Sequence, residues 1–271
     1  MIINFLIIIQ EKMERYNEYD VINHNKKAWN IDSKKNHQWT VPVEKRNIDS
    51  ARIGSWDVVL TTKKAVPHNW FPGFENLNVL GLACGGGQQI PIFSALGANV
   101  TLLDNSDIQI QKDIIVAKEN NLDIKTIEGD MSNLQCFSDE SFDLVFNPVS
   151  TIYVPEISMV FKEVYRVLKP GGRFLAGFVN PIRFIFDSLS MHDKKLIIKY
   201  KIPFNAFEQL DNRVLNKIIK LNYKICYGHS LNEIIGKQLK TGFTMVDFYE
   251  DSGDTLLDEY ILTEFATYCK K

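Results

Sequence analysis

The chain has 271 residues, of which 45% are hydrophobic, enough to bury the core of one α/β domain with added segments. Its 31 basic and 33 acidic residues give a net charge of -2, without the overall basicity that nucleic-acid binding usually needs. The four cysteines, Cys84, Cys136, Cys226 and Cys269, form no CxxC pair. They therefore predict no metal site and no disulfide framework, and they favour the reducing cytoplasm.

The N-terminal region is irregular, and it starts with the apolar run Met1–Ile9. Spanning a bilayer takes about 20 apolar residues, so no membrane span is expected. The run also lacks the basic start and the small-residue cleavage site of a signal peptide. We interpret it as an accessory strand, or as the result of a start codon placed upstream of Met13. Residues 1–70 are expected to form an extension and cap, with a helix at Val43–Ile53.

From Leu77 onward, short apolar runs alternate with helical patterns. Repeated β–α–β units require right-handed crossovers, which predicts a parallel, doubly wound Rossmann-like sheet covered on both faces. Such sheets bind ligands at the carboxyl ends of their strands. Strands are expected at Asn78–Leu82, Asn99–Asp104, Ile124–Glu128, Phe142–Asn147 and Arg173–Val179, and helices at Gln88–Leu96, after Ser106 and at Pro155–Leu168.

The last third of the chain departs from this alternation. Asn180–Gly228 is interpreted as an insertion that forms a substrate lid. A helix is expected at Ser230–Lys240, followed by strands at Phe243–Glu250 and Tyr260–Tyr268. Only a short loop joins these strands, so they are predicted to be antiparallel neighbours at one edge of a seven-stranded sheet. The second unit then spans residues 71–271.

A glycine-rich turn follows the first predicted strand, and an acid ends the second. Gly85, Gly86 and Gly87 remove every Cβ where the backbone passes close to a ligand. The helix that follows offers free N–H groups. Asp104 lies 104 − 87 = 17 residues after Gly87, where a carboxylate can accept both hydroxyls of a ribose in NAD or in S-adenosylmethionine (SAM).

A third motif, Gly129-Asp130-Met131, follows the third predicted strand. Asp130 can accept a hydrogen bond from an adenine amino group, and Met131 can pack on the ring. Because the three motifs lie at three consecutive strand ends, we expect them to line one cleft.

The motifs together resemble those of a known family. Leu82–Gln89, Leu103–Ser106 and Glu128–Met131 are similar to motifs of the class I SAM-dependent methyltransferases, and Phe137–Val145 and Phe161–Gly172 are similar to later segments of that family. The subgroup that they resemble most is the small bacterial enzymes akin to quinone-biosynthesis methyltransferases. The resemblance implies a SAM cofactor and methyl transfer to a small molecule. The expected cofactor-binding residues are Gly81, Ala83, Cys84, Gly85, Gly86, Gly87, Gln88, Asp104, Asn105, Ser106, Gly129, Asp130, Met131, Asn147, Pro148 and Val149.

Two residues depart from the family pattern. Gly81 stands where the family usually has an acid, and Ala83 stands where it usually has a glycine. That acid helps to hold the methionine ammonium, so this group must be held differently here. The candidates are backbone carbonyls near Gly81, Gln88, Asn147 or a residue of the cap.

The acceptor side is expected to follow the fourth strand. Asn147-Pro148-Val149-Ser150 partly resembles the loop of enzymes that methylate nucleic-acid amines, but it lacks the second proline and the aromatic residue that stack a flipped base. A nucleic-acid acceptor is therefore disfavoured. Ser150 and Tyr153 are expected to face a small acceptor. Simple packing of the cap core is the favoured interpretation of its tryptophans. If one of them forms an aromatic wall, Trp39 is the first choice.

The sulfonium of SAM is already electrophilic, so the protein has mainly to align the acceptor and exclude water. A general base helps only if the acceptor is a hydroxyl or a carbon acid. His37 and His68, which flank the cap, are the candidate bases, and Tyr153 is a candidate for orientation. Two alternatives remain open, a nicotinamide-dependent oxidoreductase and a non-catalytic SAM-binding regulator. A homodimer is also allowed.

Overall fold

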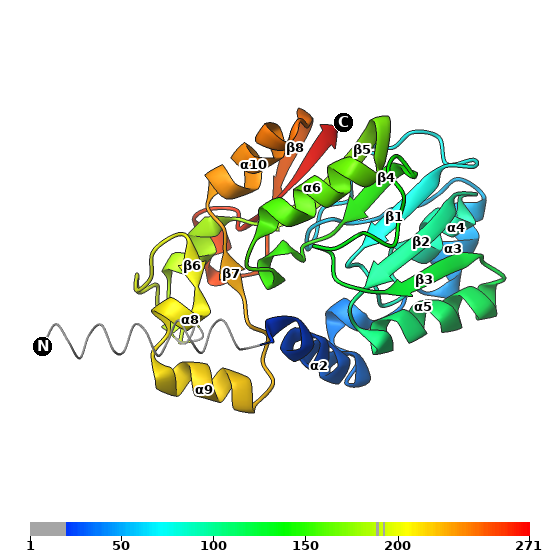
Figure 1. Ribbon diagram of the computed structural model, residues 1–271. Helices are drawn as coiled ribbons and strands as arrows, with labels where there is room; N and C mark the ends of the chain where they lie inside the picture. Colours follow the sequence, from blue (N-terminus) through cyan, green and yellow to red (C-terminus); the bar gives the residue numbers. More distant parts are fainter. Residues whose placement is uncertain (1–19, 188–189, 192) are drawn as a thin grey trace, which may run out of the picture.

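The computed structural model describes residues 20–187, 190–191 and 193–271, so the apolar run at residues 1–9 lies outside the described residues. A seven-stranded sheet has the order β3-β2-β1-β4-β5-β9-β8 (Figure 1). Strands β1 to β5 are parallel, β9 is antiparallel to β5, and β8 is antiparallel to β9. The predicted Rossmann-like fold is confirmed. The strands are β1 Asn78–Leu82, β2 Asn99–Asp104, β3 Ile124–Glu128, β4 Phe142–Asn147, β5 Leu168–Val179, β8 Thr244–Asp251 and β9 Glu264–Lys270.

Strands β1 to β4 have the predicted bounds, but β5, β8 and β9 do not. β8 spans Thr244–Asp251, one residue later than predicted. β5 begins at Leu168, before the predicted start, because Leu168 already pairs with Phe142 of β4. β9 begins at Glu264 rather than Tyr260. The carboxylate of Asp258 accepts hydrogen bonds from the backbone N–H groups of Thr255 and Thr263, which holds the preceding residues in a 3₁₀ turn.

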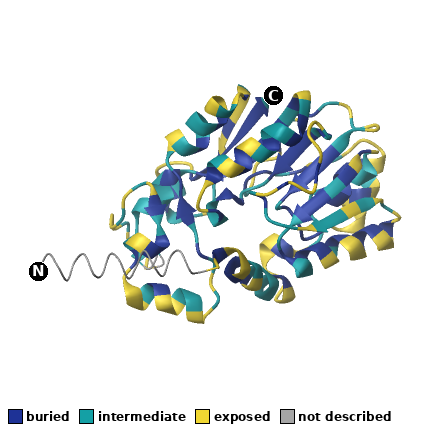
Figure 2. Ribbon diagram, viewed as in Figure 1, coloured by how far each residue is buried: buried dark blue, intermediate teal, exposed yellow. Residues whose placement is uncertain are grey.

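The sheet separates two apolar clusters, because alternate side chains of each strand point to opposite faces. Val79 of β1 belongs to one cluster and its neighbour Leu80 belongs to the other. Figure 2 shows the central strands buried and the outer helix faces exposed. The first cluster includes side chains of α3 (Lys45–Arg52), α4 (Ile90–Ala95) and α5 (Asp107–Asn120), and the second includes those of α6 (Ile157–Val167).

Several helices differ from their predicted lengths. α4 is shorter at both ends, because residues 85–89 form a loop instead of a first helical turn. The helix predicted at Ser230–Lys240 is divided into a π-helical turn, η5 (Asn232–Gly236), and α10 (Lys237–Thr241). No helix in the described ranges is long and apolar enough to cross a bilayer.

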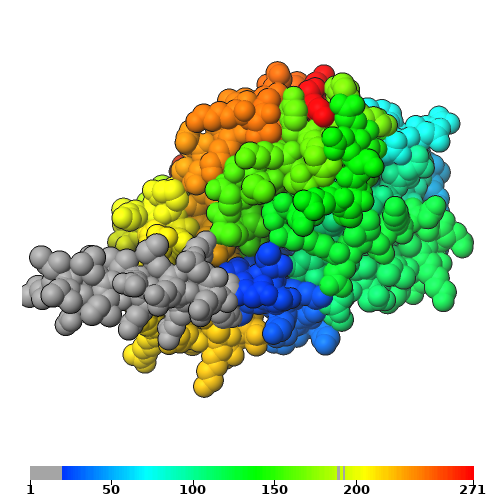
Figure 3. Space-filling model, in the orientation of Figure 1, coloured from blue at the N-terminus to red at the C-terminus, as the bar shows by residue number. Residues whose placement is uncertain are grey.

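Helix α2 (Val21–Lys34) was not among the predicted elements. Its sequence is largely polar and has no broad apolar stripe, so no apolar periodicity predicts the helix. The helix packs through side-chain hydrogen bonds instead. The Asn30 side chain donates to Asp107 at the start of α5, 2.8 Å away, and the Asn25 side chain donates to the carbonyl of Ile225, 3.0 Å away. α2 therefore bridges the sheet domain and the insertion, as Figures 1 and 3 show in dark blue.

The insertion has a small apolar core of its own. It begins with the 3₁₀ helix η4 (Pro181–Ile185) and contains α8 (Ala206–Gln209), α9 (Asn212–Lys220) and the two-stranded sheet β6–β7 (Phe204–Asn205 and Tyr227–Gly228). Val21 of α2 packs into this core.

A segment of the N-terminal region, Val59–Thr62, crosses the end of the sheet, and we call it the strap. The carbonyl of Leu60 accepts from the backbone N–H of Val149 at 3.1 Å. The strap passes so close to β5 that a Cβ on Gly177 would lie 2.1 Å from the Leu60 oxygen.

Gly177→Ala should therefore lower the free energy of unfolding by about 1–3 kcal/mol, because the strap must shift to admit the methyl group. Urea unfolding measures this change. The matched control is Gly73→Ala, whose added Cβ meets nothing within 4 Å. Equal stability of the two variants would contradict the close approach of strap and strand.

Candidate functional site

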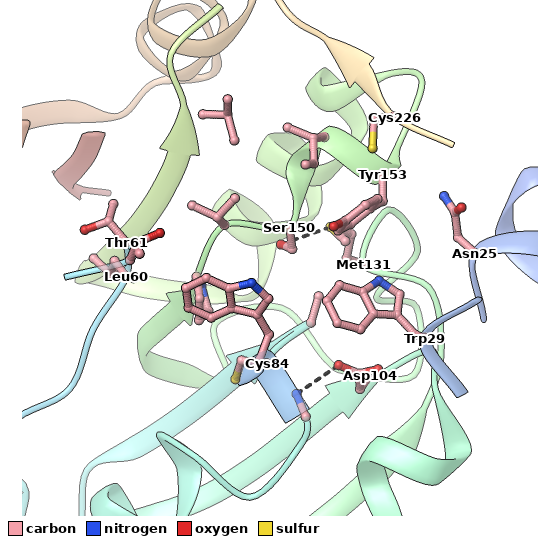
Figure 4. Close-up of a pocket in the computed structure, with 18 of the residues that line it drawn as sticks. Asn25, Trp29, Leu60, Thr61, Cys84, Asp104, Met131, Ser150, Tyr153 and Cys226 are labelled. Atoms are coloured by element: carbon pink, nitrogen blue, oxygen red, sulfur yellow. Dashed lines mark hydrogen bonds between the residues drawn. The ribbon is translucent and has the colours of Figure 1, made fainter. Parts of the chain in front are cut away.

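A cavity of about 550 Å³ lies where the parallel strands end. Gly85, Asp104 and Asp130, which follow β1, β2 and β3, all line it, so the three strand-end motifs do converge on one cleft. Side chains of α2, the strap and the insertion complete its wall, and Figure 4 shows part of this lining.

The cavity sorts the predicted site residues into two groups. Those that line it are Trp39, Ala83, Cys84, Gly85, Gln88, Asp104, Asn105, Gly129, Asp130, Met131, Pro148, Val149, Ser150 and Tyr153. The predicted residues outside the lining are His37, His68, Gly81, Gly86, Gly87, Ser106 and Asn147.

Two carboxylates accept hydrogen bonds from the backbone of the glycine loop, residues 85–87. The N–H of Gly85 donates to Asp104 Oδ2 at 2.9 Å. The N–H groups of Gly86 and Gly87 both donate to Asp113 Oδ2, at 2.7 and 2.9 Å. Gly86 and Gly87 have φ angles of +118° and +73°, which favour glycine. These two glycines therefore shape the loop, and Gly85 presents it to the cavity.

Sequence reasoning did not identify Asp113, although an acid on the buried side of α5 was a usable signal. Its side chain is fully buried. Burial raises the pKa of Asp113 to about 7, against the lowering effect of the hydrogen bonds from Gly86 and Gly87. The nearby charge of Asp104 also raises this pKa.

Asp104 keeps capacity for a ligand. Its Oδ1 accepts from the N–H of Ser106 at 2.8 Å and its Oδ2 accepts from the N–H of Gly85. Each carboxylate oxygen can accept a second bond, so a pair of vicinal hydroxyls could bind here. Burial raises the pKa of Asp104, and the bonds from Ser106 and Gly85 lower it. Beside it, the buried Oδ1 of Asn105 has no hydrogen-bond partner, which marks a second position for a ligand donor.

Gly81 lies under α4 and not at the cavity. A Cβ at this position would be 2.1 Å from Cδ1 of Ile90, so the side chain of Ile90 fills the space that an acid would occupy. Asn147 is fully buried, and its amide donates to the carbonyl of Leu82 and to Ser150 Oγ, both at 2.7 Å. Of the candidates to replace the missing acid, Gln88 and several residues of the cap, such as Gln38 and Thr61, line the cavity, whereas Asn147 does not.

His37 and His68 lie outside the cavity lining, which removes the geometric basis for a role as base. His68 stacks on Trp56 with ring centroids 4.0 Å apart, and its Nε2 lies 2.9 Å from the carbonyl of Trp56. His37 precedes the 3₁₀ turn η1 (Gln38–Thr40), and its carbonyl accepts from Thr40.

The tryptophans divide between the two roles considered for them. Trp70 is buried in the core, and its Nε1 donates to Asp247 at 2.7 Å. Trp56 packs against Phe71 and Phe74. Trp29 and Trp39 line the cavity.

An aromatic corner stands on the α2 side of the cavity. Trp29 meets Tyr153 edge to face, with ring centroids 5.6 Å apart (Figure 4). Burial raises the pKa of Tyr153 well above its ordinary value, so its phenol stays protonated at neutral pH and can donate a hydrogen bond. Tyr153 was predicted to lie here, but among the tryptophans of the cap Trp39 was preferred to Trp29, because α2 itself was not recognised.

Two charged residues of the lining that were also missed are Arg183 and Glu264, and a third is Asp254, which pairs with Lys63. Glu264 begins β9, and its Oε2 accepts from the N–H of Thr62 at 2.7 Å and from the Thr62 hydroxyl at 2.8 Å. Arg183 belongs to η4 of the insertion. Neither Arg183 nor Glu264 sits in a recognisable motif. Among the described residues, no group of three or more His, Cys, Asp or Glu side chains could hold a metal ion.

Known proteins of similar sequence identify the family. A family model described as a methyltransferase domain matches residues 80–176. The uncharacterized methyltransferase YbaJ of Bacillus subtilis is 43% identical over 247 residues, which cover 91% of this chain and 97% of that protein. The chain belongs to the class I SAM-dependent methyltransferases.

Other relatives of this methyltransferase share less of its length or sequence. A sterol 24-C-methyltransferase of Aspergillus fumigatus is 39% identical over 103 residues, 37% of this chain and 27% of that protein. A SAM-dependent methyltransferase structure from Mesorhizobium loti has a TM-score of 0.55 at 18% identity, covering 75% of this chain and 94% of that one. One from Methanosarcina mazei has a TM-score of 0.51 at 19% identity, covering 75% and 95%. At this identity the two structures support the fold alone.

Membership of this family makes SAM the cofactor of the methyltransferase and makes the protein an enzyme. The nicotinamide-dependent oxidoreductase and the non-catalytic regulator are the less supported alternatives. The quinone-biosynthesis subgroup stays a prediction.

Asp104→Ala should weaken binding of S-adenosylhomocysteine about 100-fold or more, because it removes a charged acceptor for two hydroxyls and also frees the Gly85 N–H. Isothermal titration calorimetry measures the affinity. The matched control is Asp123→Ala, an exposed acid after α5, which should bind as wild type does. Wild-type affinity of Asp104→Ala would remove this carboxylate from the site.

Asp113 should make stability depend on pH. Its pKa is higher in the folded state than in the unfolded chain, so between about pH 4 and pH 7 the folded state holds a proton that the unfolded chain releases. Its contribution to the free energy of unfolding therefore falls as the pH rises through this window.

Asp113→Asn retains an oxygen acceptor for Gly86 and Gly87 but cannot titrate. The slope of the free energy of unfolding against pH should therefore become less steep, by up to about 1.4 kcal/mol per pH unit. Urea unfolding across the window tests this, with the exposed Asp123→Asn as the control. An unchanged slope in Asp113→Asn would show that Asp113 does not titrate there.

Proposed function

We propose that this methyltransferase transfers the methyl group of SAM to a small-molecule acceptor held in the same cavity. The observation that carries the proposal is the convergence of Gly85, Asp104 and Asp130 on one cavity. That cavity continues past the strand ends to residues of the strap, α2 and the insertion, which leaves a place for an acceptor.

The residues present fit the adenosine part of the cofactor. Asp104 would accept from the ribose hydroxyls through the acceptor positions that Gly85 and Ser106 leave open. The unpaired Asn105 Oδ1 suits another donor of the nucleoside. Asp130 would accept from the adenine amino group, and the buried Met131 would pack on the ring.

The methionine part would lie along Ala83, Cys84 and the strap. We propose that Gln88, from another position, binds the ammonium group that the family's acid usually binds. Its amide nitrogen donates to the carbonyls of Gln38 and Val41 at 3.3 and 3.1 Å, which leaves its oxygen to accept from an ammonium group. Pro148 and Val149 would complete the wall near the sulfur.

When bound, SAM supplies an electrophilic methyl group, which the acceptor's electron pair takes as the bond to sulfur breaks. The protein has to align the acceptor and exclude water. We propose that Ser150 and Tyr153 orient the acceptor by hydrogen bonds, while Trp29 and Trp39 form an aromatic wall. The cap of residues 1–70 contributes α2 and the strap, and the insertion 180–228 acts as a lid.

We also propose a small acceptor in preference to a nucleic acid, because hydrogen bonds join α2 to the insertion beside the cavity. All four cysteines are free, which supports a reducing cytoplasm as the location. The homodimer stays a prediction.

Calorimetry with S-adenosylhomocysteine should give saturable one-to-one binding with a dissociation constant between about 1 μM and 1 mM, the range of most enzyme substrates. NADH fluorescence should not change on mixing with the protein. Absence of any binding of S-adenosylhomocysteine would overturn the proposal, and NADH binding would favour the oxidoreductase.

A further inference from the structure

The half of the cavity beyond the cofactor motifs has an unusual charge distribution. Its wall includes Tyr153, Val179, Phe184 and Cys226, which are apolar or weakly polar, together with Arg183 and the acids Glu264 and Asp254. Asp254 is paired with Lys63, at 2.8 Å. Arg183 is the only Lys, Arg or His side chain among the lining residues in the described part of the chain.

Arg183 shares the cavity wall with residues of three other parts of the chain. Glu264 begins β9, Cys226 lies just before β7 and Tyr153 lies after β4, and all three line the same cavity as Arg183. Burial raises the pKa of each of these three residues, and the positive charge of Arg183 lowers it by a smaller amount. Arg183 therefore belongs to the acceptor end of the cavity.

Arg183 has no direct partner for its charge within the described residues. Glu264, an acid of the same wall, makes no ion pair with it, and Glu264 Oε2 already accepts hydrogen bonds from the N–H and the hydroxyl of Thr62. The backbone of Arg183 is nevertheless fixed, since its N–H donates to the carbonyl of Asn180 at 3.0 Å and Asn180 caps η4.

A half-buried guanidinium without a counter-ion costs free energy unless a ligand supplies one. Guanidinium groups pair best with planar or tetrahedral oxyanions, which accept two parallel N–H bonds. On the basis of the proposed function, we infer that the methyl acceptor carries a carboxylate or phosphate group and that Arg183 binds it. The apolar residues of this wall then contact the hydrocarbon part of the acceptor, and the nucleophilic atom of the acceptor faces Ser150.

The test compares small aromatic probes that differ in charge, with the protein saturated in S-adenosylhomocysteine. Benzoate and phenyl phosphate should bind about tenfold or more tightly than neutral benzamide, measured by calorimetry. Arg183→Gln should abolish this preference without changing the affinity for S-adenosylhomocysteine. Tighter binding of benzoate would indicate that the acceptor carries a carboxylate, and tighter binding of phenyl phosphate would indicate that it carries a phosphate.

The matched control is Arg213→Gln, which removes an exposed arginine of α9 outside the cavity and should retain the preference. Equal binding of benzamide, no binding of either acid, or a preference that survives Arg183→Gln would overturn the inference. Each of these results leaves the proposed function intact if S-adenosylhomocysteine binds. A protein that does not bind S-adenosylhomocysteine would instead refute the proposed function.

Discussion

The site depends on carboxylates that accept hydrogen bonds from the backbone of the loop after β1. Asp104 holds Gly85, and Asp113 holds Gly86 and Gly87. A loop of three glycines has little conformational preference of its own, so it needs such bonds to adopt one shape. The two acids come from β2 and α5, so the glycine loop takes this shape only when β1, β2 and α5 are packed together.

Packing explains why a glycine at position 81 is compatible with the fold. Ile90 of α4 occupies the space beside it, which adds to the apolar core and excludes an acid. We propose that groups at the cavity wall hold the methionine ammonium in place of that acid. Gln88 is suited to this role, because its amide is tied to the cap and its oxygen is left available.

The cavity is closed by segments that are far apart in sequence. α2 bonds to α5 on one side and to the insertion on the other, and the strap crosses between β4 and β5. Apolar side chains also anchor these segments, since Val21 of α2 packs into the core of the insertion and Leu60 of the strap packs into the core of the sheet domain. Hydrogen bonds and apolar packing together hold the wall of the cavity in place.

The sequence by itself determined the alternating strands and the three motifs at their ends, because period-two burial and glycine-rich turns are local properties. It could not reveal Trp29, Arg183 or Glu264 as part of the cavity. Trp29 lies on a polar helix with no apolar stripe, and the other two lie in no motif. Only the tertiary structure brings these residues together, since their neighbours in the cavity come from distant parts of the chain and no local pattern encodes that proximity.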